Sequence, residues 1–158
     1  MDCGNDPSLH ITGSITCSAW MKARILEGSQ TLLTVNPWWL SSGEFGGTFP
    51  RGERGITYVW TENRVDVKDG KWHHVVGVHD GAKVCLYVDG ILVDFETHGG
   101  SAVAYNDPAY IGVDEPYYSK SQWNGLIDDV CIYSYALNPE EVKMLYERKE
   151  PPREKRSD

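Results

Sequence analysis

Apolar and polar residues alternate along most of this chain, with the two-residue period that is typical of half-buried β-strands. In the first such run, residues 11–21, one face of the extended chain carries four apolar side chains: Ile15, Cys17, Ala19 and Met21. Similar runs predict further strands at 30–35, 56–60, 71–79, 83–88, 91–96, 108–114 and 125–137. Residues 36–55 contain two prolines and five glycines, so we expect a loop there.

Three Asp-Gly pairs, at 69–70, 80–81 and 89–90, punctuate the middle of the chain. Asp-Gly suits the positive φ angles of the tight turns that join hairpin strands. The segments between and after these pairs therefore predict a three-stranded antiparallel meander. Both faces of its strands carry apolar residues, so we expect the sheet to be covered on both sides.

One helix is predicted near the C-terminus. Asn138 can cap it, Pro139 suits its first position, and Glu141 completes a capping-box arrangement. The helix is expected to run to about Lys149, so residues 1–149 form one domain and the charged, proline-containing residues 150–158 a tail or linker. Short strands, regular turns and one late helix predict an all-β fold, a two-sheet antiparallel β-sandwich with one short C-terminal helix.

Composition narrows the class of function. The net charge of −8 and the isoelectric point of about 5.1 argue against binding to nucleic acid, which rewards clustered Lys and Arg. Six tryptophans are many for 158 residues, and such residues favour β-sheets and binding faces. The sequence contains no run of apolar residues long enough to predict a transmembrane helix.

The four cysteines do not have the spacing of a zinc site. Cys17, Cys85 and Cys131 lie inside predicted strands, where a buried free thiol is the simplest expectation. With Cys3 included, three complete disulfide pairings are open, and the sequence does not choose among them.

The segment DGKWHHVVGVHDGAKVCLYVDGILV resembles the signature of the LamG-like jelly-roll domains, part of the concanavalin A-like lectin/glucanase superfamily. The likeness continues, in order, in NDPSLHITGSITCSAWMK, AYIGVD and WNGLIDDVCIYSYALNPEEVKMLY, and it spans about residues 5–147. It implies a jelly-roll sandwich. Members usually have one more strand before the segment that begins here at Asn5, and only four residues precede Asn5, so we expect one edge of the sandwich to be incomplete.

The resemblance also implies a setting. Members are mostly non-catalytic modules of secreted or surface proteins, often attached to enzymes, adhesins or other binding domains. We therefore expect an extracellular or cell-surface location, attachment to other domains and no insertion into a membrane.

A structural calcium ion is common in the superfamily. By resemblance its ligands here would be Asp129 with Asn5 and Asp6, or the carbonyls of the latter two. Such oxygen ligands are those that calcium prefers. If the last strand is regular, alternation turns Asp128 away from Asp129.

The adjacent His73 and His74 are candidates for a metal or catalytic site, but neighbouring residues of a strand point to opposite faces. They cannot converge on one ion or act as a pair, and in the family they are structural positions. We likewise expect Asp69, Asp80 and Asp89 to be turn residues rather than ligands.

Catalysis by a glucanase of this superfamily requires carboxylates at alternate positions of one strand, so that they face the sugar together. This sequence has no such run. Glu62 and Asp66 are separated by Arg64, and Asp94 and Glu96 supply only two acids. We therefore expect no enzymatic activity.

Aromatic residues in loops and at strand margins are the candidates for a sugar site, because rings stack on the apolar C–H patches of sugars. Trp38 and Trp39 are adjacent and cannot both be buried on one face, so one is expected to be exposed or at a sheet margin. The expected ligand-binding residues are Trp38, Trp39, Trp60, Asn63, Arg64, Tyr117, Tyr118 and Trp123.

These features together predict a module that binds a carbohydrate or glycoprotein without catalysis. A protein-interaction or spacer module without a sugar site remains open as an alternative, and a diverged glycoside hydrolase or lyase is a third reading. The residues do not identify the ligand, the parent protein or the oligomeric state.

Overall fold

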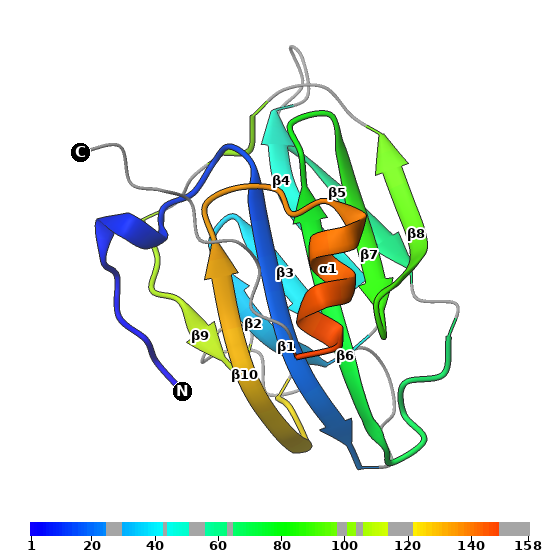
Figure 1. Cartoon of the computed structure of the whole chain (residues 1–158). Helices are drawn as coiled ribbons and strands as arrows, with labels where there is room; N and C mark the ends of the chain where they lie inside the picture. The colour runs from blue at the N-terminus through cyan, green and yellow to red at the C-terminus, as the bar shows by residue number, and fades with distance from the viewer. Residues whose placement is uncertain are drawn as a thin grey trace, which may run out of the picture.

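The chain forms two five-stranded antiparallel sheets packed face to face, with one helix lying across the outer face of one sheet (Figure 1). The computed structural model describes residues 1–24, 30–42, 44–50, 56–62, 65–97, 101–103, 106–113 and 122–148, with the backbone only for 48–50 and 56–62. The prediction of an all-β, two-sheet jelly-roll sandwich with a short C-terminal helix is confirmed.

The first sheet, here called the α1 sheet, has the strand order β10-β1-β6-β7-β8. Its strands are β1 (Ile15–Ala23), β6 (Trp72–His79), β7 (Lys83–Val88), β8 (Ile91–Thr97) and β10 (Gly125–Tyr133). The second sheet, here called the β9 sheet, has the order β5-β4-β3-β2-β9. Its strands are β2 (Thr31–Val35), β3 (Trp38–Ser41), β4 (Glu44–Pro50), β5 (Ile56–Glu62) and β9 (Tyr110–Ile111).

The main core lies between the two sheets. The face predicted to be apolar in β1 is confirmed, because its four odd-numbered apolar residues are buried in this core. Glycine makes room for the largest rings. A Cβ atom at Gly47 would lie 2.6 Å from the Trp38 ring, and one at Gly77 would lie 2.1 Å from the ring of Phe45.

A second apolar cluster covers the outer face of the α1 sheet. It joins Val76 and Val78 of β6 to Leu137 and Val142 of the C-terminal segment. The helix α1 (Pro139–Tyr146) begins with the predicted capping box, in which the Asn138 side chain accepts from the Glu141 N–H. The expectation that the meander is covered on both sides is thus confirmed for β6 and β7 but not for β8, where Leu92 and Phe95 are exposed. The helix ends three residues before Lys149.

The loop predicted for residues 36–55 is wrong, because it contains β3 and β4. Proline and glycine in this stretch mark the turn at Asn36–Pro37, which is a cis peptide bond, and the close approach at Gly47. The expected strand at 108–114 shortens to β9, and the one at 125–137 ends at Tyr133. The expected tail, residues 150–158, lies outside the described residues.

The three Asp-Gly pairs play different roles. Asp89 and Gly90, with φ of 50° and 78°, form the two-residue loop between β7 and β8. Asp80 and Gly81 lie in the longer turn between β6 and β7. Asp69-Gly70 does not connect hairpin strands, because it precedes β6, and β5 belongs to the other sheet. The predicted meander, β6-β7-β8, is confirmed.

Residues 1–4 lie along the edge of the β9 sheet next to β9. The Cys3 N–H donates to Ala109 O at 2.8 Å, and the Ala109 N–H donates to Gly4 O at 2.9 Å. A bridge also joins Asp2 to Tyr110. The edge that was expected to be incomplete is therefore lined by these residues.

A β-bulge interrupts β10 where it pairs with β1. Trp20 pairs with Asp128 and Ser18 with Cys131, so two residues of β10 stand where β1 has one. Asp129, with φ of 47°, is at this bulge. The strand is therefore not regular here, so the condition under which alternation would turn Asp128 away from Asp129 is not met, and both residues are exposed.

All four cysteines are free thiols. Cys17 and Cys85 are buried, Cys131 is partly buried and Cys3 is exposed. Burial raises the pKa of the Cys17 thiol to about 12, so this group is a packing residue with low reactivity.

Candidate functional site

One row of residues crosses the β9 sheet and brings together side chains that suit a sugar. The strand register aligns Tyr110 with Thr34, Thr34 with Trp39, Trp39 with Gly46, and Gly46 with Trp60. Directly paired residues of antiparallel strands share a face of the sheet. The fold thus places three aromatic residues, separated in sequence, at one level of one face.

Trp38 fixes which face this is. Its ring is fully buried between the sheets, 5.9 Å from the ring of Phe45 and 4.6 Å from that of His79. Its indole N–H donates to the carbonyl of Ile11. Neighbouring residues of a strand alternate, so Trp39 lies on the outer face of the β9 sheet. Trp38 is a core residue, and the expectation that it contacts a ligand is wrong for this arrangement.

The outer part of the row is partly accessible. Trp39, Thr34 and Tyr110 are each half-buried, whereas Gly46 is buried under its neighbours. Gly46 has no side chain to separate the positions of Trp39 and Trp60. At the end of the adjoining turn, the Asn36 amide donates to a carboxylate oxygen of Asp107 at 2.9 Å. The row therefore offers partly exposed aromatic surface, and the Thr34 hydroxyl and the Asn36 amide are close to it in the sequence.

The other expected ligand residues have different outcomes. Trp60 is in the row by its backbone register. Asn63, Arg64, Tyr117 and Tyr118 lie outside the described residues, so their role stays a prediction. Trp123 is half-buried against the main core, and its indole nitrogen is buried without a hydrogen-bond partner. Tyr110 and Thr34 were missed, because only the pairing of β9 with β2 connects them to Trp39.

His73 and His74 lie on opposite faces, as predicted. The two ring nitrogens of His73 contact carboxylates, Nδ1 at 2.8 Å from Asp89 and Nε2 at 3.0 Å from Asp69. Burial lowers the pKa of His73, but the hydrogen bonds and charges of Asp89 and Asp69 outweigh it and raise the pKa above its usual value. Contact of both ring nitrogens with carboxylates favours the protonated ring, and it ties the turn before β6 to the β7–β8 turn.

His74 points to the outer face of the α1 sheet. Its ring lies 5.1 Å from that of Trp20 and 6.4 Å from that of Tyr146 in α1. Burial lowers the pKa of His74 to about 4, against a smaller opposite effect of the Asp89 charge. His74 is therefore neutral at pH 7, and it packs the helix onto the sheet.

The residues expected to bind calcium are engaged in local structure. The Asn5 amide donates to Asn106, and its carbonyl oxygen contacts His10. Asp6 caps the short 3-10 helix η1 (Pro7–Leu9), where its carboxylate accepts from the Ser8 N–H at 2.9 Å. In the described part of the chain, no three His, Cys, Asp or Glu side chains group so as to hold a metal ion, Asp129 included. These residues do not form a ready calcium site, and calcium binding stays a prediction.

The acids considered for catalysis form two groups, Glu62 and Asp66 before β6, and Asp94 and Glu96 together on β8. The Asp66 carboxylate accepts from the Lys68 N–H at 2.9 Å, which is a turn contact. Glu62 ends β5, while Asp94 and Glu96 pair with Leu86 and Val84 along the edge strand β8. The four acids therefore do not form one group of carboxylates that could face a single ligand.

The family of the chain is clear from its sequence. Residues 3–143 match the Laminin_G_3 family, described as concanavalin A-like lectin/glucanases superfamily. The chain belongs to this superfamily. The suspected resemblance is thereby confirmed, and its jelly-roll fold agrees with the sandwich described above.

A curated relative shows how such a domain can occur in a larger protein. The chain is 29% identical over 163 residues to the "Sushi, von Willebrand factor type A, EGF and pentraxin domain-containing protein 1" of Rattus norvegicus. The match covers 88% of this chain but only 4% of that protein. The mouse protein of the same name is 26% identical over 155 residues, with the same coverage.

Solved structures share the fold. The Ruminococcus gnavus IT-sialidase CBM40 bound to alpha2,3 sialyllactose aligns with a TM-score of 0.69 and 14% identity, over 92% of this chain and 90% of that one. Domain 4 of AbnA, a GH43 extracellular arabinanase from Geobacillus stearothermophilus, in complex with arabinotriose, aligns with a TM-score of 0.58 and 20% identity, over 85% and 67%. Such low identities show the fold alone. In the described segments, the helices are too short or too polar to cross a bilayer.

Proposed function

We propose that this chain is a non-catalytic carbohydrate-binding module of a larger extracellular or cell-surface protein. The observation that carries the proposal is the row of Tyr110, Thr34, Trp39 and Trp60 on the outer face of the β9 sheet. Aromatic rings offer apolar faces for the C–H patches of sugars. The Thr34 hydroxyl donates to Val113 O at 3.5 Å, and a hydroxyl can also accept a hydrogen bond from a sugar.

Two comparisons support this proposal. The CBM40 and AbnA domains, which share the fold, are described with bound sialyllactose and arabinotriose. The curated relatives carry many other domains, which fits a module that works within a larger chain. A partly exposed row of this size would bind one sugar weakly, so useful affinity would come from several linked modules.

A glycan array tests the proposal, with Trp39→Ala as the main variant and Phe95→Ala as its matched control. Phe95 is an exposed aromatic residue of β8 in the other sheet. We expect specific glycan signals that Trp39→Ala weakens by about tenfold and Phe95→Ala leaves unchanged. No signal with folded protein, or equal loss in both variants, would overturn the proposal. A repeat in EDTA tests whether calcium contributes.

A protein-interaction module is the second candidate. Two exposed apolar residues of β8 favour it, because Leu92 and Phe95 are 45% and 53% exposed and pair with Tyr87 and Cys85 on the outer face of the α1 sheet. A second copy of the chain is the simplest partner for such a face. Sedimentation velocity across a wide concentration range tests it. Leu92→Ser is expected to weaken any self-association, and a monomer at every concentration would argue against this candidate.

A further inference from the structure

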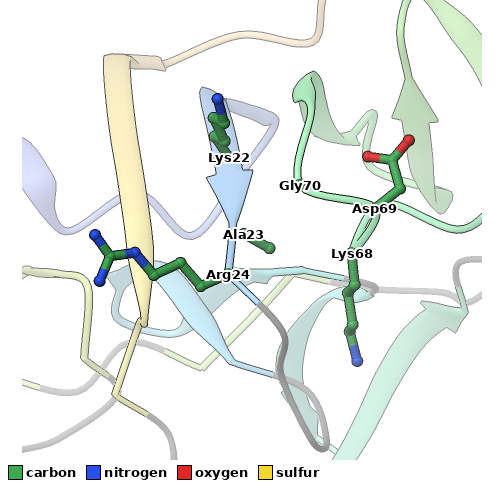
Figure 2. A pocket seen from close by; sticks show the side chains of 6 residues that line it. All are labelled: Lys22, Ala23, Arg24, Lys68, Asp69 and Gly70. Carbon is green, nitrogen blue, oxygen red and sulfur yellow. The ribbon is translucent and has the colours of Figure 1, made fainter.

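A cavity of about 580 Å³ opens where β1 ends, beside the loop that leads into β6. Among the described residues, it is lined by Lys22, Ala23, Arg24, Lys68, Asp69 and Gly70. Figure 2 shows these residues meeting from two segments, residues 22–24 and 68–70, that are far apart in the sequence. None of them belongs to the aromatic row of the β9 sheet.

The lining is cationic although the whole chain carries a net charge of −8. Three side chains are positive, and Asp69 is the one acid among the described lining residues. That acid already has cationic partners, because Asp69 lies 3.0 Å from both Lys71 Nζ and His73 Nε2. The backbone N–H of Lys71 and the His73 and Lys71 side chains hold the pKa of Asp69 well below its usual range. The charge of Asp69 is therefore directed to Lys71 and His73, neither of which is among the described lining residues, rather than to Lys22 or Arg24.

The cationic head groups are spread around the cavity. Figure 2 shows Lys22, Arg24 and Lys68 extending in different directions around Ala23 and Gly70. Such a spread suits a ligand with negative charges distributed along a chain better than one compact ion. By strand register, Lys22 also lies between Trp72 of β6 and Leu126 of β10, which are 41% and 55% exposed. An exposed indole beside a cation can receive the ring of a sugar and its charge together.

We propose that this cavity binds an anionic glycan, in which Lys22 and Arg24 contact carboxylate or sulfate groups. The site is distinct from the aromatic row, and it deepens the proposed carbohydrate-binding function by naming a class of ligand. Guanidinium and ammonium groups are well suited to both oxyanions. Because the contacts lie at the surface, their strength depends on ionic strength.

The test uses three polymers of one backbone and matched length: dextran, carboxymethyl-dextran and dextran sulfate. Binding is measured by titration calorimetry at low and at high salt. We expect at least one charged polymer to bind about tenfold more tightly than dextran, with affinity falling as salt rises. Binding of carboxymethyl-dextran alone identifies a carboxylate ligand, binding of dextran sulfate alone a sulfate ligand, and binding of both a general anion site.

Three variants that each remove one positive charge complete the design. Lys22→Gln and Arg24→Gln are expected to weaken binding of the charged polymer by about tenfold. Lys83→Gln is the control, because Lys83 begins β7 at the opposite end of the α1 sheet, where β6 ends at His79. Equal affinity for all three polymers, or equal weakening by Lys83→Gln, would overturn the proposal. Thermal unfolding of each variant confirms that the fold is kept.

The test of the anionic site can fail or succeed independently of the test of the aromatic row. If Trp39→Ala abolishes binding to an array glycan while the charged and neutral dextrans bind alike, the carbohydrate module stands and the anionic site fails. If charged polymers bind through Arg24 but Trp39→Ala changes nothing, the cavity stands and the aromatic row fails.

Discussion

Trp38 and Trp39 follow one another in β3 and lie on opposite faces of the β9 sheet. Trp38 is fully buried beside Phe45, at 5.9 Å between ring centroids, whereas Trp39 is half-buried and pairs with Gly46. Two identical side chains at adjacent positions thus have different structural roles. One fills the core, and the other belongs to the candidate ligand face.

Alanine substitutions should separate these two roles. Trp38→Ala is expected to lower the free energy of unfolding by about 3–5 kcal/mol, because it removes a large buried ring and leaves a cavity. Trp39→Ala is expected to cost about 1 kcal/mol or less, since its ring is partly solvated. Chemical denaturation of both variants measures this difference, and equal costs would contradict the placement of the two rings.

Gly77 should not tolerate a side chain. A Cβ atom there would lie 2.1 Å from the ring of Phe45, so Gly77→Ala must push apart the two sheets. We expect a loss of about 1–3 kcal/mol or more by overpacking. Gly13→Ala is the matched control, because nothing lies within 4 Å of its added methyl group, and it should change stability by less than about 1 kcal/mol. Similar thermal stability of the two variants would refute the tight contact.

The pKa of His73 should respond to Asp89. The two carboxylates that contact its ring raise this pKa above 6.5, so the folded state binds the proton more tightly than the unfolded state. The resulting stabilisation is full below about pH 6.5 and is lost as the pH rises through the raised pKa. Asp89→Asn should lower the pKa of His73, as followed by an NMR titration of the ring proton.

Asp80→Asn serves as the control for that titration. Asp80 lies in the turn at the other end of β6, where its carboxylate accepts from Ala82 and Lys83 N–H groups. It should leave the His73 pKa unchanged. A wild-type His73 that titrates below 6.5 would show that burial, rather than the two carboxylates, dominates its environment.

His74 should produce the opposite dependence on pH. Its folded-state pKa of about 4 lies below the unfolded value of 6.5, so the unfolded state takes up the proton first. Stability is then full above about pH 6.5 and declines as the pH falls toward 4, by roughly 3 kcal/mol in total. His74→Phe keeps an aromatic ring against Trp20 and Tyr146 but removes the group that takes up the proton.

The measurement is the free energy of unfolding of wild type and His74→Phe at pH 5 and pH 7. The variant should lose less stability than the wild type between pH 7 and pH 5, and the difference isolates His74 from the carboxylates. If both proteins lose the same amount, the ring of His74 must be protonated or solvated in the folded state.

The expectations that succeeded depend on short stretches of chain. The helix cap requires only Asn138 and Glu141, three residues apart, and the β7–β8 turn requires only Asp89 and Gly90. Alternation in β1 likewise reports its own buried face. These signals are local, because the chemistry that causes them acts between residues close in sequence.

The expectations that failed depend on contacts between residues that are far apart in the sequence. The glycines of residues 36–55 indicated a loop, but Gly47 is in a strand because the Trp38 ring occupies the place of its side chain. The bulge at Asp129 exists only because β10 pairs with β1 in one register. A pattern of residue types does not contain that register.

The residue pattern alone predicts an all-β sandwich of the concanavalin A-like superfamily, with alternating strands, a two-residue turn and a capped C-terminal helix. The packing of the strands is needed to know which tryptophan faces outward, which residues join Trp39 in one row, and that Lys22 and Lys68 line one cavity. The physical reason is that side-chain alternation is a property of each strand alone. The level at which strands meet, and what lies across the sandwich, are set by the packing of all of them.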